Sequence, residues 1–479
     1  MVRKAKSTDV IRRDELGVSP LYWARVGETV VVSDSLNELF MESKLPRKLR
    51  REMLGEYFAQ GWICEPDTIW EGVHKIPAGC ELVVNGGRCE VRRWWSVSGG
   101  ASKGESELKA MIAASVDKAL EGDKKVCNWF SGGIDSSLLA AFTRTRGLKH
   151  LHMTMGDAES ERVKRMEAAF GLDVERLAPE VSLIELYPEL CRRIGEPIAD
   201  PGIIAAYWLS KESVDRGCTA VLCGMGGDEI DAGYPRARIV VKMFSGAAKL
   251  IPWRIVGFAL IAAGLLLKGK RKRDFLRLGN FMRSPDVSHY FNLFGYFTKT
   301  EIDKIVGNGW FSSYQSKVNG LTAAFRGKKR FFAYEFMGFL ASHNNIYGAR
   351  ACAEGGVECR MPLLAPDVVQ TLWPKIDARH NAGKRRLSKV LSDELGPSFV
   401  KVRKSGFRFP VEQKLKDVDW RMVRDRLRDV VQKAGLELFD QYVVQLKAGA
   451  VDEVYMKLWA FWTLSNFLGP IVGYERCVP

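Results

Sequence analysis

The sequence predicts an α/β protein with a doubly wound parallel sheet, a smaller mostly β region before it and a helical extension after it. Three observations carry this prediction. Strand-like runs alternate with runs of helical periodicity from about residue 106 to residue 235. Two glycine clusters each follow a strand-like run, and beyond residue 235 the periodicity is helical. Because such sheets bind ligands at the carboxyl ends of their strands, we expect the ligand site at the glycine clusters.

The first hundred residues are expected to form short strands and turns. Residues 28–33 and 81–84 are rich in valine, and the second run is followed by the turn signal Asn85-Gly86-Gly87. Residues 96–104 are rich in glycine and serine, which is typical of a linker. We therefore predict two domains, residues 1–100 and residues 106–479.

The elements of the second domain follow from their periodicity. Leu108, Met111, Ile112, Val116 and Ala119 recur at helical spacing, and Glu121-Gly122-Asp123 ends this helix. The expected order then continues with a strand (125–130), a helix (136–144), a strand (151–155), a helix (159–170), a strand (174–177), a helix (183–194), a strand (219–223) and a last strong helix (453–467).

Composition bounds the function. An apolar fraction of 46% and a charged fraction of 27% are typical of a globular protein. The net charge of +15 favours contact with polyanions, but basic residues are spread along the chain without a nucleic-acid-binding motif. Ten cysteines include no C-x-x-C pair, which argues against a zinc or redox site and favours reduced thiols in the cytoplasm. The charged N-terminus predicts no signal peptide.

An apolar run, residues 255–267, precedes the basic residues 268–273. Its 13 residues are fewer than the roughly 20 that span a bilayer. Two interpretations remain: a buried core helix, or a helix that contacts a membrane surface or partner protein through 255–273. Because apolar runs of this length are more often core, we favour the buried helix.

The first glycine cluster, Ser131-Gly132-Gly133-Ile134-Asp135-Ser136-Ser137, lies between the strand ending at Phe130 and a helix. Glycines let the backbone approach a phosphate, and the following helix N-terminus supplies amide donors. Asp135 would repel the anion but suits a magnesium ion, and the lysine of a Walker loop is absent. A capped Ser/Gly turn is the alternative. The seven-residue pattern between strand and helix favours the phosphate site.

This loop resembles that of the pyrophosphatase-loop ATP enzymes, which leave an adenylated intermediate, and later segments resemble asparagine synthetases. The resemblance extends in order over residues 131–410, with Leu363 in place of a phenylalanine. The segments that carry it are 195–201 (GEPIADP), 222–229 (LCGMGGDE) with 233–236 (GYPR), 357–364 (VECRMPLL) and 404–410 (KSGFRFP).

The N-terminal residues resemble part of the family's glutaminase domain. Residues 13–22 (RDELGVSPLY), 69–73 and 76–79 carry this likeness. In the family a nucleophilic cysteine follows the initiator methionine, whereas Val2 stands here and the first cysteine is Cys64. The front half of the domain has no counterpart. We therefore expect residues 1–100 to be a truncated, degenerate glutaminase-like domain that does not hydrolyse glutamine.

The resemblance implies roles for individual residues. Asp135 and Asp228 would hold Mg²⁺ on the ATP phosphates, although capping aspartates are the alternative. Lys404 would stabilise the developing negative charge, unless it is a surface lysine. The residues expected to bind ATP are Phe130, Ser131, Gly132, Gly133, Asp135, Ser136, Ser137, Cys223 and Gly224.

Met225 departs from the family pattern. Asparagine synthetases have a glutamate there, and the related β-lactam and carbapenam synthetases use a tyrosine with a glutamate as the base. A methionine accepts no proton, so ammonia-dependent amidation of aspartate is not expected. Glu358 is the candidate catalytic base, with structural pairing to Arg360 as its alternative.

The resemblance implies an ATP-dependent synthetase that adenylates a carboxylate and couples it to an amine. Lasso-peptide macrolactam cyclases fit this description, and the basic chain would suit an acidic peptide or a partner protein. The alternatives are amidation of a sugar acid or small metabolite with amine supplied in trans, and a non-catalytic homologue that binds ATP.

Overall fold

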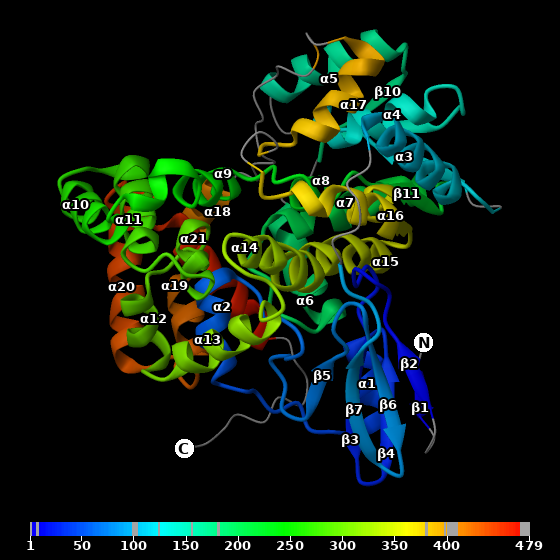
Figure 1. Ribbon diagram of the computed structural model, residues 1–479. Helices are drawn as coiled ribbons and strands as arrows, with labels where there is room; N and C mark the ends of the chain where they lie inside the picture. The colour runs from blue at the N-terminus through cyan, green and yellow to red at the C-terminus, as the bar shows by residue number, and fades with distance from the viewer. Residues whose placement is uncertain are drawn as a thin grey trace.

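The computed structural model describes residues 2–5, 9–97, 104–122, 125–154, 157–179, 183–378, 382–396, 399 and 411–469. Its centre is a parallel five-stranded sheet with strand order β10-β9-β8-β11-β12 (Figure 1). Register pairs Leu222 of β11 with Asn128 of β8 and with Arg360 of β12. The strands are β8 (Val126–Trp129), β9 (Lys149–Met153), β10 (Val174–Leu177), β11 (Ala220–Leu222) and β12 (Glu358–Arg360).

Helices cover both faces of this sheet, as the doubly wound prediction requires. Adjacent residues of β11 point to opposite faces, so Val221 joins one hydrophobic core and Leu222 the other. The Leu222 side packs against α3 (Glu105–Ala119), α4 (Ile134–Thr143), α5 (Asp157–Phe170) and α17 (Arg385–Leu395), and the Val221 side against α6 (Tyr187–Ile194), α7 (Gly202–Asp215) and α15 (Ala351–Gly355).

The N-terminal region is mostly β and forms two small antiparallel sheets, ordered β1-β4-β3-β5 and β2-β6-β7. The predicted strands at 28–33 and 81–84 correspond to β4 and β6, while most of the predicted linker lies outside the described residues. The elements are β1 (Val2–Ala5), β2 (Val10–Arg12), β3 (Tyr22–Val26), β4 (Thr29–Ser33), α1 (Leu36–Ser43), α2 (Met53–Gln60), β5 (Val73–Lys75), β6 (Cys80–Asn85) and β7 (Arg88–Arg93).

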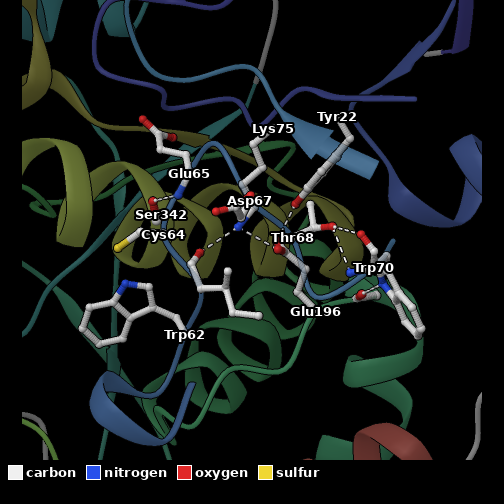
Figure 2. Close-up of polar contacts among 12 residues, drawn as sticks. Tyr22, Trp62, Cys64, Glu65, Asp67, Thr68, Trp70, Lys75, Glu196 and Ser342 are labelled. Carbon is white, nitrogen blue, oxygen red and sulfur yellow. Dashed lines mark hydrogen bonds and ion pairs between the residues drawn. The ribbon is translucent and has the colours of Figure 1, made fainter. Parts of the chain in front are cut away.

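This region is packed against the rest of the chain through a polar interface. Figure 2 shows Lys75 and Tyr22 converging on Glu196, at 2.7 Å and 2.8 Å. The Glu65 amide donates to Ser342. Tyr22, Glu65 and Lys75 belong to the N-terminal region, whereas Glu196 and Ser342 belong to the rest of the chain. One hydrophobic core also runs through both parts. The N-terminal region is therefore packed into the rest of the chain.

A long helix of the C-terminal part contains a π-helical stretch. It runs through η4 (Glu335–Asn344) and η5 (Ile346–Arg350), a geometry that recurs at functional sites. The other helices are α8 (Gly227–Ile230), α9 (Pro235–Met243), α10 (Trp253–Leu265), α11 (Gly269–Arg283), α12 (Lys299–Val306), α13 (Trp310–Leu321), α14 (Lys329–Tyr334), α16 (Pro366–Leu372), α18 (Val411–Lys414), α19 (Trp420–Leu427), α20 (Lys433–Lys447) and α21 (Val451–Leu468).

Two features differ from the sequence predictions. The region beyond residue 235 was expected to be helical, yet it contributes β12 to the sheet, because three residues are too few to show a period. The expectation of a buried helix at 255–267 was wrong. Only Gly257 and Gly264 of α10 are buried, and Ile255 and Leu265 are 68% and 65% exposed. Over the part of the chain that is described, no helix is long and apolar enough to cross a membrane.

Candidate active site

The glycine loop follows β8 at the carboxyl edge of the sheet and is held by its own hydroxyls. The Ser136 Oγ accepts from the Ser131 amide at 3.2 Å, and the Ser131 Oγ accepts from the Gly133 amide at 3.3 Å. Gly132 has a φ of +65°, and a Cβ there would lie 3.2 Å from the Val163 backbone. Glycine is therefore required at this turn. The loop leads into the N-terminus of α4, whose amides and dipole favour an anion.

Two carboxylates and one lysine converge beside this loop. Asp135 is in the first turn of α4, and Asp228 is in α8, which follows β11. The Lys384 ammonium contacts Oδ2 of Asp135 and lies 3.0 Å from Oδ2 of Asp228. A side chain at Gly227 would collide with Asp135, at 2.2 Å from Oδ1. The second glycine cluster thus lets the two acidic segments approach one another.

Electrostatics in this cluster favours a cation. Burial alone would lower the pKa of Lys384, but Asp135 and Asp228 outweigh burial and raise it. Burial and the neighbouring Asp228 raise the pKa of Glu229 to about 7. The lysine side chain is only 5% exposed. It therefore remains protonated at neutral pH as the shared partner of both carboxylates.

The same pair of carboxylates fits a magnesium ion. They are close enough to bind one cation, as their shared contact with Lys384 shows. Within the described ranges no cluster of three or more His, Cys, Asp or Glu side chains could hold a metal. Magnesium commonly takes one or two carboxylates and completes its shell with phosphate oxygens and water. Asp135 and Asp228 suit that mode of binding.

Two cavities meet at the loop. The smaller, of about 260 Å³, has mostly apolar walls that suit a nucleoside. It includes six of the residues expected to bind ATP and hold magnesium: Phe130, Ser131, Asp135, Ser136, Cys223 and Gly224. The larger, of about 510 Å³, is reached by Gly132, Gly133 and Asp228. Ser131, Asp135, Met225 and Tyr347 line both, so a phosphate on the loop would face the larger cavity.

Aromatic side chains form much of the larger cavity. Trp62 comes from the N-terminal region, Phe339 and Tyr347 from the π-helical stretch, and Phe294 and Tyr296 from the segment before α12. Its size is in the range of sites for organic ligands.

An arginine that lines the larger cavity is already neutralised. Arg236 donates two 2.7 Å hydrogen bonds to Glu335, so it offers little free charge. Tyr234 and Phe339 lie against its guanidinium, with ring centroids at 3.8 Å and 4.5 Å.

A third and larger groove, of about 1000 Å³, is lined by Glu56, Asp67, Trp310 and Lys317 but not by the glycine loop. Its lysine is paired, because the Lys317 Nζ lies 2.6 Å from Glu56 and 2.7 Å from Asp67.

The structure brings some expected site residues together and not others. Lys404 lies outside the described residues. Glu358 is at the amino end of β12, where Arg360 pairs with it at 3.0 Å, and it lines neither cavity. The interpretation of Glu358 as the catalytic base is not supported by this position, and the pairing alternative is the one observed. The side chain of Ser137 is buried and lines neither cavity.

Sequence reasoning missed Lys384. It stands in the run Gly383-Lys384-Arg385-Arg386, which by composition is typical of a solvated surface. The structure gives Lys384 a φ of +59° at the N-cap of α17. A left-handed lysine stores strain, and such positions cluster at functional sites. Only the glycine before it hinted at an unusual backbone.

A nucleotide-type loop, a pair of carboxylates and a buried lysine at the carboxyl edge of a doubly wound sheet define a nucleotide-binding α/β enzyme. Comparison with known proteins agrees. Residues 107–467 match the asparagine synthase family, and residues 1–95 match the glutamine amidotransferase domain. The chain therefore belongs to the asparagine synthase family and is an ATP-dependent, amide-forming ligase.

The relatives are distant. A glutamine-hydrolyzing asparagine synthetase 1 from Bacillus subtilis (strain 168) is 22% identical over 482 residues, which is 95% of this chain and 74% of that protein. A putative glutamine-hydrolyzing asparagine synthetase from Mycobacterium tuberculosis (strain ATCC 25618 / H37Rv) is 27% identical over 46% of this chain, and the match spans 37% of that protein. A solved NH3-dependent NAD synthetase from Campylobacter jejuni covers 28% of this chain and 61% of its own, with 19% identity and a TM-score of 0.22, and supports no conclusion.

Proposed function

We propose that this chain adenylates a carboxylate with ATP and couples it to an amine that does not come from glutamine. The observation that carries the proposal is the convergence of the glycine loop, Asp135, Asp228 and Lys384 at the junction of an apolar cavity and a larger aromatic one. The smaller cavity would take adenosine, with Cys223 and Gly224 against the base. The larger would take the acyl group and the amine.

Each polar group has a part in the first step. Loop amides and the α4 N-terminus would hold the phosphates. Asp135 and Asp228 would hold Mg²⁺, which neutralises phosphate charge when bound. Lys384, and Lys404 beyond the described residues, would stabilise the negative charge that builds on pyrophosphate and the acyl oxygen.

The cysteines of the N-terminal region indicate whether glutamine can supply the amine. Glutamine hydrolysis needs an activated thiolate. Burial raises the pKa of Cys64 to about 12, and burial also raises the pKa of Cys80 and Cys89. No cysteine described in residues 2–97 is therefore activated. This supports an amine supplied by the acceptor itself or in trans.

We further propose a macrolactam cyclase that joins a peptide N-terminus to an acidic side chain of the same peptide. The aromatic cavity of about 510 Å³ supports an organic acceptor larger than ammonia. Amidation of a sugar acid or small metabolite is the second candidate. A homologue that binds ATP without reacting is the third, and the intact acidic and lysine groups favour the first two. Because ATP is its substrate, we place the enzyme in the cytoplasm.

The test is pyrophosphate release with ATP and Mg²⁺. Each reaction would contain a peptide encoded beside the gene with a free N-terminus and an Asp or Glu, or a panel of sugar acids with ammonium chloride, or L-aspartate with ammonium chloride. A macrolactam cyclase yields a peptide lighter by one water, detected by mass spectrometry. Pyrophosphate release with sugar acids alone would support the second candidate. No release with any carboxylate would leave only the ATP-binding homologue.

The exposed face of α10 supports a further partner, an anionic membrane surface contacted through residues 255–273. Ile255 and Leu266 are 68% and 88% exposed, while Gly257 and Gly264 pack α10 against α11. Lys268, Lys270 and Arg271 flank this face and are exposed. Apolar side chains beside basic ones fit an interfacial helix on anionic lipid. The α10–α11 pair lies on the far side of the helical part from β1–β7 (Figure 1).

Co-sedimentation with vesicles tests this contact. Wild-type protein should bind vesicles that contain phosphatidylglycerol and not pure phosphatidylcholine. Ile255→Glu with Leu266→Glu should abolish binding. Val444→Glu, which changes an equally exposed side chain on α20, should not. Equal binding of the double variant would refute the contact.

A further inference from the structure

Residues 195–199, just before α7, are held in place by contacts with the N-terminal region. The family resemblance of this segment gives it no role. Glu196 is buried and contacts Lys75 and Tyr22 (Figure 2). The Trp70 indole donates to the Gly195 carbonyl at 2.9 Å, and the Ala199 amide donates to the Gly61 carbonyl at 2.8 Å. These contacts fix the backbone directly before Asp200, whose carboxylate lines the larger cavity.

Asp200 faces a histidine of the π-helical stretch. The Oδ2 of Asp200 lies 3.3 Å from Nε2 of His343, whose ring also lines the cavity. His343 is 2% exposed, while the Asp200 side chain is 41% exposed. The other oxygen of Asp200 accepts from the Gly202 amide at 2.8 Å. The pair is therefore open to the cavity on the Asp200 side only.

The hydrogen-bond network fixes the tautomer of His343. Asn344 donates its amide nitrogen to Glu229, so its Oδ1 is an acceptor. That oxygen lies 2.8 Å from Nδ1 of His343, which must therefore carry a hydrogen. In the neutral ring, Nε2 then carries a lone pair and faces Oδ2 of Asp200. Because both atoms are hydrogen-bond acceptors, a ligand that donates to both would stabilise the pair.

The surroundings select a cationic donor. The Trp62 ring, from the N-terminal region, lies 4.5 Å from the His343 ring, and Phe339 lies 5.0 Å from it. Aromatic faces attract cations. Arg236, which also lines the cavity, is neutralised by Glu335. Burial would raise the pKa of Asp200, but the neighbouring His343 and the hydrogen bond from the Gly202 amide lower it, so Asp200 stays anionic.

We propose that Asp200 and His343 form the subsite for the incoming amine. The N-terminal region forms one wall of this subsite through Trp62 and through its contacts with residues 195–199. The inference rests on the proposed function. The ammonium of the acceptor approaches Oδ2 of Asp200 from the cavity side, next to Nε2 of His343, and His343 accepts one of its protons. The freed lone pair forms the N–C bond to the acyl carbon. The C–O bond to AMP breaks, AMP leaves with the electron pair, and the second proton passes to solvent.

Binding of glycinamide tests the subsite without catalysis. Glycinamide carries an α-ammonium like that of a peptide N-terminus, and saturation-transfer NMR reports its binding to the full chain. Asp200→Asn keeps an acceptor for the Gly202 amide but removes the charge, so affinity should fall at least tenfold. N-acetylglycinamide, which has no ammonium, should not bind. The matched control Asp173→Asn, at an exposed site, should bind as the wild type does. Unchanged affinity in Asp200→Asn, or no saturable binding to wild type, would overturn the subsite.

Catalysis tests the proton transfer. With a carboxylate that supports pyrophosphate release, His343→Gln should still trap the acyl adenylate with hydroxylamine, which is uncharged at neutral pH. Coupling to glycinamide should fall about a hundredfold or more, the scale for losing a general base. His289→Gln, at a histidine that does not line the cavity, is the control. Equal losses with both nucleophiles would show a structural role for His343. Absence of pyrophosphate release would reject the proposed function, while the glycinamide titration would still decide the subsite.

Discussion

Lys384 offers a direct test of the acidic cluster. In Lys384→Met the side chain keeps its length but loses the charge that Asp135 and Asp228 share. Two largely buried carboxylates then face one another without the lysine charge. Breaking a buried ion pair in this way costs about 3–5 kcal/mol. For a chain of 479 residues the unfolding entropy is about 1 kcal/mol/K. The melting temperature should therefore fall by about 3–5 °C.

The assay is differential scanning calorimetry in EDTA and again with saturating Mg²⁺. Because magnesium can take the position of the ammonium between the carboxylates, it should stabilise Lys384→Met more than the wild type. It should remove at least half of the difference in melting temperature between the two proteins. The matched control is Lys389→Met on the same helix. Its Nζ pairs with Asp393 but is half exposed, so the change should be less than about 1 kcal/mol.

A wild-type melting temperature for Lys384→Met, or an equal loss in Lys389→Met, would refute the reasoning. So would a variant that magnesium does not rescue. In that case the two carboxylates do not form a cation site.

Four further predictions follow from the same observations. Asp135→Asn and Asp228→Asn should each abolish AMP formation while circular dichroism remains native, and near-normal turnover in either would remove the magnesium assignment. Lys404→Ala should lower kcat about a hundredfold or more with a much smaller change in ATP affinity, and an unchanged kcat would make Lys404 a surface charge. The purified chain should release no glutamate from glutamine, and a coupled glutamate dehydrogenase assay that detects release would contradict the assignment of the N-terminal region. Burial raises the pKa of Asp231 to about 7, although the hydrogen bond from the Leu387 amide lowers it. The native state therefore favours the protonated carboxyl. The contribution of Asp231 to the unfolding free energy is full below the unfolded pKa of about 4 and is lost as pH rises through about 7. Asp231→Asn should flatten the decline in unfolding free energy between about pH 5 and pH 8 by about 2–3 kcal/mol, which denaturant titrations at the two pH values would measure.

The sequence alone was enough for the fold class. Strand and helix periods depend on neighbours along the chain, so the alternation over residues 106–235 identified four strands of the sheet and the helices between them except α7. The position of the Ser131–Ser137 loop between β8 and α4 is local in the same sense. Asp228 could be predicted because its glycine-rich segment follows a strand, and parallel strands bring their carboxyl ends to one edge.

The tertiary structure decided what depends on residues far apart in sequence. Lys384 is 249 residues from Asp135, and its basic neighbours gave it the composition of a surface segment. The exposure of α10 depends on what packs against it, which no hydropathy value reports. Glu358 lines neither cavity, because the pairing of β12 with β11 places it at the amino end of a strand of the central sheet.

The Asp200–His343 pair is the clearest case. Trp62, Asp200 and His343 come from three segments that share no local pattern. They meet because the N-terminal region contacts both residues 195–199 and the π-helical stretch. Sequence periodicity therefore determined the sheet and the phosphate loop, whose geometry is local. Only long-range packing determined which charges face one another in the cavity, because ion pairs and hydrogen bonds depend on distances that the order of residues does not contain.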